Sequence, residues 1–291
     1  MEEMTTEATP DDSGQVASGA GVGTPEASQF DRMQFDPASL PENLRNEPSL
    51  QTFSTVDNLA KSYVNAVKKI VESGILSQYL GEWDADFYGG PQVREFEERW
   101  SDYFKIKNSI AVNSCTSGLI IALGAIDLQP GDEVIVSPWT MSASATAILV
   151  WNAIPVFADI EDETFNLDPV SIEKNITPYT KAIVVTNIFG HPASLYEIMA
   201  IAKKYKLKVI EDNAQAPGAL YHDKYTGCVS DIGVFSLNYH KHIHTGEGGM
   251  CVTNNDELAE RMLLIRNHAE AVSNGCRSCQ EPLRYSVQSS P

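Results

Sequence analysis

The sequence is short of positive charge and has no long apolar run. Lysine and arginine together number 21, against 39 aspartate and glutamate residues, which gives a formal net charge of −18. A chain this acidic is repelled by nucleic acids and by anionic membranes, so we expect neither as a partner. No run of 18 apolar residues occurs, and the N-terminus lacks a basic segment followed by an apolar one. These absences argue against a membrane span or a secretory signal and favour a cytoplasmic protein.

Cysteine is scarce as well. The five cysteines are an odd number and do not form the framework of a secreted domain, so we expect free thiols. Cys276 and Cys279 have the spacing of a zinc knuckle, but no second pair accompanies them, and we expect no metal site. His240, His242 and His244 are interpreted as a polar turn, with the lining of a substrate site as the alternative.

The first 50 residues differ in composition from the rest of the chain. They carry ten acidic residues against two arginines and are rich in glycine, serine, threonine and proline. This composition predicts an acidic, disordered leader over residues 1–55. Gly19, Gly21 and Gly23 resemble the glycine spacing of a nucleotide-binding loop. No apolar strand precedes them, so we interpret the segment as low-complexity sequence.

From about residue 56 the sequence alternates between helical and strand patterns. Apolar periodicity predicts helices over residues 56–73, 92–104, 116–128, 142–152, 169–175, 193–205 and 255–268. Short apolar runs predict strands over residues 109–113, 133–137, 155–160, 181–187, 207–211 and 232–237. Strands that alternate with helices favour an α/β fold, in which a mostly parallel sheet lies between two layers of helices.

Two polar residues stand next to predicted strands. Lys241 follows the apolar run 232–237; by itself it would be interpreted as a surface lysine, but the edge of a packed strand can desolvate an amine and make it nucleophilic. Asp212 ends another buried strand, at the edge of a parallel sheet where ligands bind, although it could simply cap the next turn. Together they suggest a pyridoxal phosphate (PLP) site. A carboxylate can keep the pyridine nitrogen protonated, and Ala214 is small enough to lie beneath the ring.

A cluster of hydroxyl residues marks a third feature of such a site. Thr116 and Ser117 lie in the turn between the strand 109–113 and an apolar helix. A helix N-terminus offers free N–H groups and the positive end of a dipole, which suits a phosphate dianion. Ordinary capping of the helix is the alternative interpretation.

These segments belong to a longer ordered series. The stretches are Gly90–Glu97, Thr116–Leu119, Pro130–Val134, Asp159–Ile160, Val209–Tyr221, Gly227, Asp231–Ser236, Lys241 and Thr245–Gly249. In sequence and order they closely resemble the DegT/DnrJ/EryC1/StrS family of PLP-dependent sugar aminotransferases, over about residues 85–270. The resemblance implies the large domain of a fold-type I PLP enzyme over residues 56–272. The family continues into a smaller C-terminal domain, in place of which we expect an irregular tail over residues 273–291.

The resemblance also implies a role for each matching residue. Lys241 would form the Schiff base with PLP and then shuttle a proton, Asp212 would bind the pyridinium nitrogen, and Gln215 would lie near the phenolic oxygen. Ser236, Thr116 and Ser117 would hold the phosphate. Two positions depart from the family pattern. Cys115 replaces a usual glycine, and Met141 replaces a usual aromatic ring that stacks on the cofactor. Met141 can still pack on a ring face, while Trp139 either substitutes for the missing aromatic or belongs to the core.

The resemblance implies transfer of an amino group from glutamate or glutamine to a keto-sugar or to a keto-cyclitol. We expect the keto-sugar to be nucleotide-linked and the enzyme to be a homodimer. Three alternatives stay open. A non-catalytic PLP-binding remnant or interaction protein would fit the lack of a C-terminal domain. A PLP-dependent sugar dehydratase is disfavoured by Lys241, since such relatives carry histidine there. A nicotinamide-dependent dehydrogenase is disfavoured because no glycine fingerprint follows an early strand.

Overall fold

The computed structural model describes residues 55–75, 77–81 and 85–269. Apart from Thr55, the predicted leader (1–55) lies outside the described residues, as do the predicted tail (273–291), Cys276 and Cys279. The chain divides into two compact units, Met1–Gly74 and Ile75–Pro291. Among the described residues, none of the helices combines the length and the apolar character that crossing a membrane requires.

The described part of the first unit is one helix, α3 (Val56–Ser73), which has the bounds predicted from the sequence. The side chain of Thr55 caps its N-terminus by accepting a hydrogen bond from the backbone N–H of Asn58 at 3.2 Å. Gly74 ends the helix with a positive φ of 70°, a conformation that glycine adopts without strain. These end signals explain why the helix boundaries could be read from the sequence.

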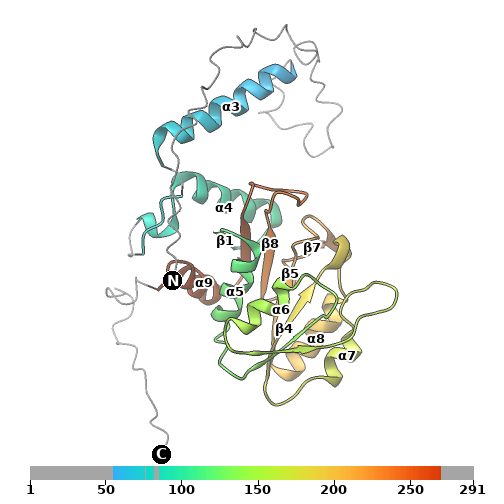
Figure 1. Cartoon of the computed structure of the whole chain (residues 1–291). Helices are drawn as coiled ribbons and strands as arrows, with labels where there is room; N and C mark the ends of the chain where they lie inside the picture. Colours follow the sequence, from blue (N-terminus) through green and yellow to red (C-terminus); the bar gives the residue numbers. More distant parts are fainter. Residues whose placement is uncertain (1–54, 76, 82–84, 270–291) are drawn as a thin grey trace, which may run out of the picture. The chain divides into compact units, whose positions relative to one another are not determined.

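The second unit is built on a seven-stranded sheet, with strand order β1-β9-β8-β5-β4-β2-β3 (Figure 1). The strands are β1 (Asn108–Val112), β2 (Glu133–Val136), β3 (Ile154–Phe157), β4 (Thr180–Thr186), β5 (Lys208–Asp212), β8 (Ile232–Ser236) and β9 (Gly249–Thr253). Adjacent strands from β3 to β8 pair in parallel, whereas β9 pairs antiparallel with both β8 and β1. The predicted mostly parallel sheet is therefore confirmed, and β9 is a strand that the sequence analysis did not predict.

The predicted helices also form. They are α4 (Pro91–Phe104), α5 (Cys115–Ala125), α6 (Ala143–Leu149), α7 (Pro169–Lys174), α8 (Leu195–Tyr205) and α9 (Asp256–Arg266). Short additional elements are the 3₁₀ turns η3 (Ala85–Tyr88) and η4 (Ile188–Gly190) and the hairpin of β6 (Leu220–Tyr221) with β7 (Lys224–Tyr225). Helices α5 and α6 end three residues before their predicted ends. The chain turns with positive φ at Asp127 and Asn152, where a right-handed helix cannot continue.

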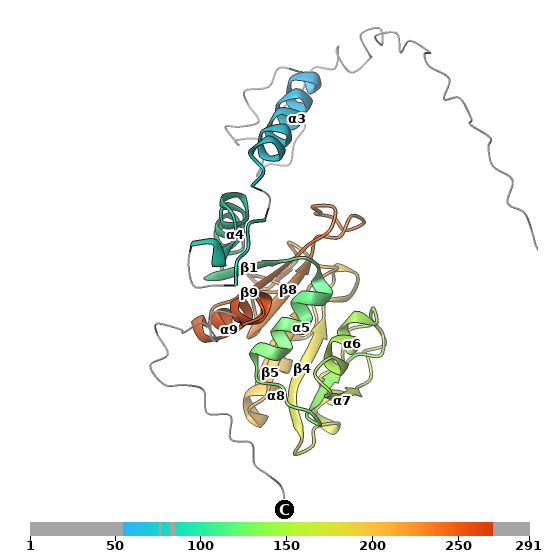
Figure 2. The same ribbon diagram turned by 60° about the vertical axis from the view of Figure 1, so that its left-hand side comes forward.

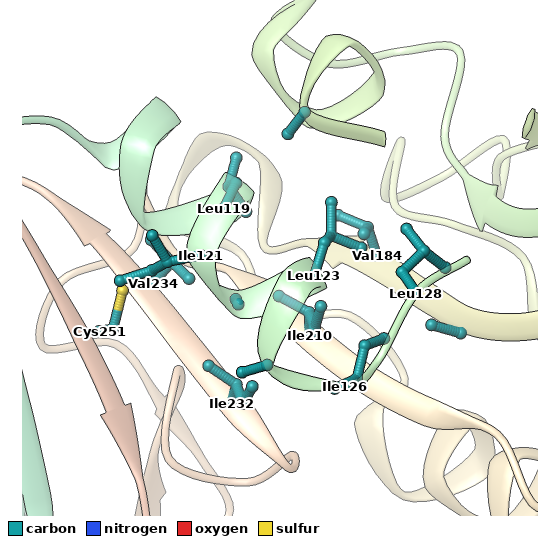
Figure 3. Close-up of a cluster of buried hydrophobic side chains, with 14 of the residues drawn as sticks. Leu119, Ile121, Leu123, Ile126, Leu128, Val184, Ile210, Ile232, Val234 and Cys251 are labelled. Carbon is teal, nitrogen blue, oxygen red and sulfur yellow. The ribbon is translucent and has the colours of Figure 1, made fainter. Parts of the chain in front are cut away.

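Alternate residues of the strands face opposite layers of helices. Ile210 and Val234 belong to the core cluster with α5, α6 and α9, whereas Val209 packs with α7 and α8. Figure 2 shows α5 lying across the sheet, and in Figure 3 its Leu123 lies beside Val184 and Ile210. On the opposite face α4 packs on β8 and β9. This alternation makes three layers, and it also sends the neighbouring residues at each strand end to opposite faces.

Glu211 is the buried anion of the α7 and α8 face, and it organises the end of β5. Its carboxylate accepts hydrogen bonds from the backbone N–H groups of Gly227 (2.6 Å), Val229 (3.0 Å) and Ser230 (2.9 Å) and from the Asn187 side chain (3.0 Å). The loop that supplies these donors lies so close to β8 that a Cβ atom on Gly233 would stand 1.8 Å from the Gly227 carbonyl oxygen. Four hydrogen bonds to one charge thus bind the 227–230 loop to the sheet.

We expect Glu211→Gln to destabilise the protein by about 3 kcal/mol, because the amide NH₂ replaces an acceptor and leaves two buried donors without a partner. Chemical denaturation followed by circular dichroism measures this. The matched control is Glu173→Gln, which removes an exposed ion pair with Lys204 and should barely move the midpoint. Equal midpoints for the two variants would show that the 227–230 loop does not depend on the anion.

Candidate active site

Three polar side chains gather at the carboxyl ends of three neighbouring parallel strands. Thr186 of β4 is paired in register with Asp212 of β5, and Asp212 is paired with Val234 of β8, two residues before Ser236. Thr186, Asp212 and Ser236 have the same parity as the residues that pack against α5. The pleat therefore directs all three to the face where α5 begins, and each is less than 7% exposed.

The N-terminus of α5 lies at this edge of the sheet. Ser114 caps the helix: its Oγ accepts from the Ser117 N–H at 3.1 Å, and its carbonyl oxygen accepts from the Gly118 N–H at 3.0 Å. Gly249 of β9 runs directly beneath, and a Cβ atom there would lie 2.7 Å from the Ser114 carbonyl carbon. Ordinary capping of this turn is therefore observed, and the first turn of α5 faces the strand ends.

A cavity of about 190 Å³ lies between the strand ends and this helix terminus. The predicted site residues that line it are Thr116, Met141, Asp212, Ala214, Gln215, Ser236 and Lys241. Ser117 is the exception, because it lines a different cavity beside Ile265 and Arg266. Apart from Ser117, the structure brings the predicted residues together from five separate segments of the sequence.

Lys241 enters the cavity from the turn between β8 and β9. Its backbone N–H donates to the Asn238 carbonyl oxygen at 2.9 Å, and the Asn238 amide donates to both carboxylate oxygens of Glu247 at 2.8 Å. These bonds tie the two ends of the turn together. His240, His242 and His244 are all exposed, and His240 is the one of the three that lines the cavity.

Asp212 is the buried acid of the cavity, only 4% exposed. Its Oδ2 accepts a hydrogen bond from the Ser144 hydroxyl at 2.6 Å, and its Oδ1 accepts from the Ala214 N–H at 3.2 Å and from the Cys115 thiol at 3.9 Å. Burial raises the pKa of Asp212, and the hydrogen bonds from Ser144 and Ala214 and the charge of Lys241 oppose that rise. The pKa of Asp212 is raised on balance, and these donors limit the rise.

The two positions that depart from the family pattern differ in their surroundings. Burial, followed by the charge of Asp212, raises the pKa of Cys115 well above its usual range, so this thiol is neutral and acts as a donor. Met141 lines the cavity but is 65% exposed. Trp139 is 51% exposed and does not line the cavity; its ring lies 6.2 Å from that of Phe165. Trp139 is therefore neither a core residue nor a substitute for the missing aromatic.

Gln215 links the cavity to the neighbouring η4 turn. Its Oε1 accepts a hydrogen bond from the Phe189 N–H at 2.9 Å, which holds Phe189 at a positive φ of 55°. Bulky residues rarely adopt this conformation unless the surroundings enforce it. The ring of Phe189 is 69% exposed and lies 6.4 Å from that of Phe165.

Sequence reasoning missed the hydroxyl residues that support Asp212. Ser144 is fully buried, and Thr140 lies within 3.2 Å of both Ser144 and Thr186. Nothing in the spacing of these residues singles them out, because Ser144 lies 68 positions from Asp212 and Thr140 lies four positions further upstream. Serine and threonine near a helix start are also common as simple caps.

The chain is similar to curated proteins that are named as enzymes of amino-sugar and aminocyclitol chemistry. The chain is 44% identical over 177 residues to a GDP-perosamine synthase of Caulobacter vibrioides, and the match covers 61% of this chain. The matches to this and two further relatives cover 46–51% of the relatives' own lengths. It is 36% identical over 210 residues to an L-glutamine:2-deoxy-scyllo-inosose aminotransferase of Streptoalloteichus tenebrarius, covering 71% of this chain and 48% of that protein. The chain thus spans about half the length of the curated relatives it matches.

The fold is shared with solved structures. The crystal structure of NtdA from Bacillus subtilis, with bound cofactor PMP, superposes with a TM-score of 0.63 at 34% sequence identity, covering 72% of this chain and 45% of that one. The model of the DegT/DnrJ/EryC1/StrS aminotransferase family matches residues 77–282, and so extends beyond both ends of the resemblance seen over about residues 85–270. The chain belongs to the DegT/DnrJ/EryC1/StrS aminotransferase family.

Proposed function

We propose that the chain carries the cofactor-binding part of a PLP-dependent aminotransferase, which transfers an amino group from glutamate or glutamine to a keto-sugar or keto-cyclitol. The observation that carries the proposal is the convergence of Lys241, Asp212 and the N-terminus of α5 on one cavity. Relatives named for a GDP-linked sugar and for L-glutamine with a cyclitol support the two substrate classes. A nucleotide-linked keto-sugar is the acceptor that we favour.

The residues of the cavity fit PLP. A buried carboxylate, an amine, a helix N-terminus and a polarisable thioether are the groups that its pyridine nitrogen, aldehyde, phosphate and ring face require. No hydrogen bond from the backbone N–H of Cys115 or Thr116 is found within the described part of the chain, so both remain able to donate to a phosphate. When bound, PLP supplies an electron sink for the reacting carbon.

Each side chain has a proposed task. Asp212 holds the proton on the pyridine nitrogen, Gln215 lies near the phenolic oxygen, and Ala214 lies beneath the ring. Met141 packs on the other ring face. Thr116 and Ser236 bind the phosphate, and Ser117 contributes mainly through the helix end to which it belongs, because its own N–H already serves the Ser114 cap.

Lys241 has two proposed tasks. Its Nζ would hold the cofactor as a Schiff base through the cofactor aldehyde, and when free it would take up and return the proton at the substrate carbon. The hydrogen bonds of the 238–247 turn support the second task, since they keep the lysine near the cavity after release. A sugar dehydratase is disfavoured because its base is expected to be histidine at this position.

We further propose that the protein is a cytoplasmic homodimer. Trp139, Phe165 and Phe189 form a contiguous aromatic surface, 51%, 45% and 69% exposed, next to the cavity. Exposed apolar surface of this kind marks interaction sites. A second copy of the chain is its proposed partner, as the family resemblance implies. A PLP-binding protein without turnover stays the alternative function.

Lys241→Ala should abolish the visible absorption band that the purified protein develops with PLP, because no other amine would form the Schiff base. Spectrophotometric titration with PLP measures this, and Lys224→Ala, a lysine of the β6–β7 hairpin, is the control that should keep the band. A band that survives in Lys241→Ala would contradict the assignment of this lysine.

Asp212→Asn should leave PLP binding largely intact but slow the first half-reaction by about 100-fold, the scale seen when a preorganised charge is removed from an active site. Stopped-flow spectroscopy with glutamate or glutamine follows conversion to pyridoxamine phosphate. Asp256→Asn, which removes an exposed acid paired with Lys107, is the matched control. If the unaltered protein binds PLP but neither amino acid converts it, the alternative of PLP binding without turnover is favoured instead.

A further inference from the structure

Ser144 makes the shortest of the three hydrogen bonds to Asp212. Its hydroxyl lies 2.6 Å from Oδ2, compared with 3.2 Å for the Ala214 N–H and 3.9 Å for the Cys115 thiol. Ser144 is fully buried near the start of α6, so no solvent competes for its proton. A short hydroxyl bond to an ionised carboxylate is among the strong hydrogen bonds of proteins.

The Ser144 hydroxyl is the end of a chain of three hydroxyls. The Thr140 Oγ1 lies 3.2 Å from the Ser144 Oγ and 3.2 Å from the Thr186 Oγ1. Thr140 precedes α6 and Thr186 ends β4, so the chain joins two elements to the end of β5. Asp212 is therefore supported from the α6 and β4 side of the cavity, on the same face of the sheet as α5.

The carboxylate sets the direction of every bond in this chain. An ionised Asp212 only accepts, so Ser144 must give its single hydroxyl proton to Oδ2. Ser144 then accepts from Thr140, which in turn accepts from Thr186. All three dipoles consequently point their positive ends toward Asp212, and hydrogen bonds aligned in this way strengthen one another.

The other groups that face Asp212 do not replace this support. Lys241 reaches the cavity from the β8–β9 turn and becomes committed to the cofactor under the proposed function, while Cys115 is a weak donor at a longer distance. Ala214 occupies only Oδ1. Removing the Ser144 hydroxyl would leave Oδ2 with no donor among the described residues.

We propose that Ser144, oriented by Thr140 and Thr186, is a positioning residue that keeps Asp212 anionic and fixed, so that the cofactor's pyridine nitrogen retains its proton. The proposal rests on the proposed function for the role of that nitrogen. The hydroxyl chain itself is a property of this protein without any cofactor, so it can be tested separately.

The first test uses the protein without PLP. Carbon-13 NMR of the aspartate carboxyl groups, with Asp212→Asn to assign the signal, follows the titration of Asp212. Ser144→Ala should move its midpoint to higher pH, because the anion loses its closest donor. Ser137→Ala is the control, since Ser137 is a buried serine of the same segment that accepts from the Trp139 N–H and does not contact Asp212. Equal midpoints in Ser144→Ala and the control would overturn the proposal.

The second test uses the protein loaded with PLP labelled with nitrogen-15 in its ring. The nitrogen-15 chemical shift of Ser144→Ala should move toward that of unprotonated pyridine, and the half-reaction with the amino donor should slow by about tenfold, the scale of one hydrogen bond to a charge. Ser144→Thr, which keeps a hydroxyl, should restore both. An unchanged shift in Ser144→Ala would overturn the proposal.

The experiments distinguish a failure of this proposal from a failure of the proposed function and from misfolding of the variant. If PLP fails to bind the unaltered protein, the proposed function fails, while the carboxyl titration still decides the role of Ser144. If Ser144→Ala does not fold, Thr140→Val takes its place, because it removes the preceding hydroxyl without changing the side-chain shape. Thr140→Val should move the Asp212 midpoint in the same direction by less, and no movement would overturn the hydroxyl chain.

Discussion

The hydrogen bonds that converge on the two adjacent carboxylates at the end of β5 organise the rest of the structure. Glu211 faces the α7 and α8 layer, where it accepts from three backbone N–H groups of the 227–230 loop and from Asn187. Asp212 faces the α5 layer and the cavity. The pleat of one strand therefore separates a carboxylate that binds a loop from one that lines the cavity, although they are neighbours in sequence.

The hydrogen bonds of Glu211 also support the strand ends that surround the cavity. By binding the 227–230 loop, Glu211 fixes the entry to β8, the strand that delivers Ser236 and then Lys241. Asn187 bonds both Glu211 and Asn213, so the ends of β4 and β5 are joined as well. The cavity thus forms at strand ends whose spacing depends on the hydrogen bonds of Glu211 and Asn187. The start of α5 and the turn before α6 complete its walls.

Much of the fold could be predicted from the sequence, for local reasons. Helix α3 has its capping threonine and its terminal glycine next to the residues they serve, and the buried strands are short apolar runs. Strand β9 was missed because Gly249 begins it, directly after the glycines of the 246–248 turn, and glycine usually indicates the turn itself. It pairs antiparallel with β8 and with β1, and the residues of β1 lie more than 100 positions away in the sequence.

The sequence by itself determined the alternating α/β order and, through ordered motifs, the family and the residues that line the cavity. Tertiary structure alone decided which supporting groups reach them. Ser144, Thr140 and Thr186 meet Asp212 only because helix packing and strand register bring three distant segments together. Ser117 shows that a motif can also include a residue outside the cavity, since it shares a motif with Thr116 but faces another cavity. A motif specifies residue types along the chain, whereas hydrogen-bond partners are chosen by packing in space.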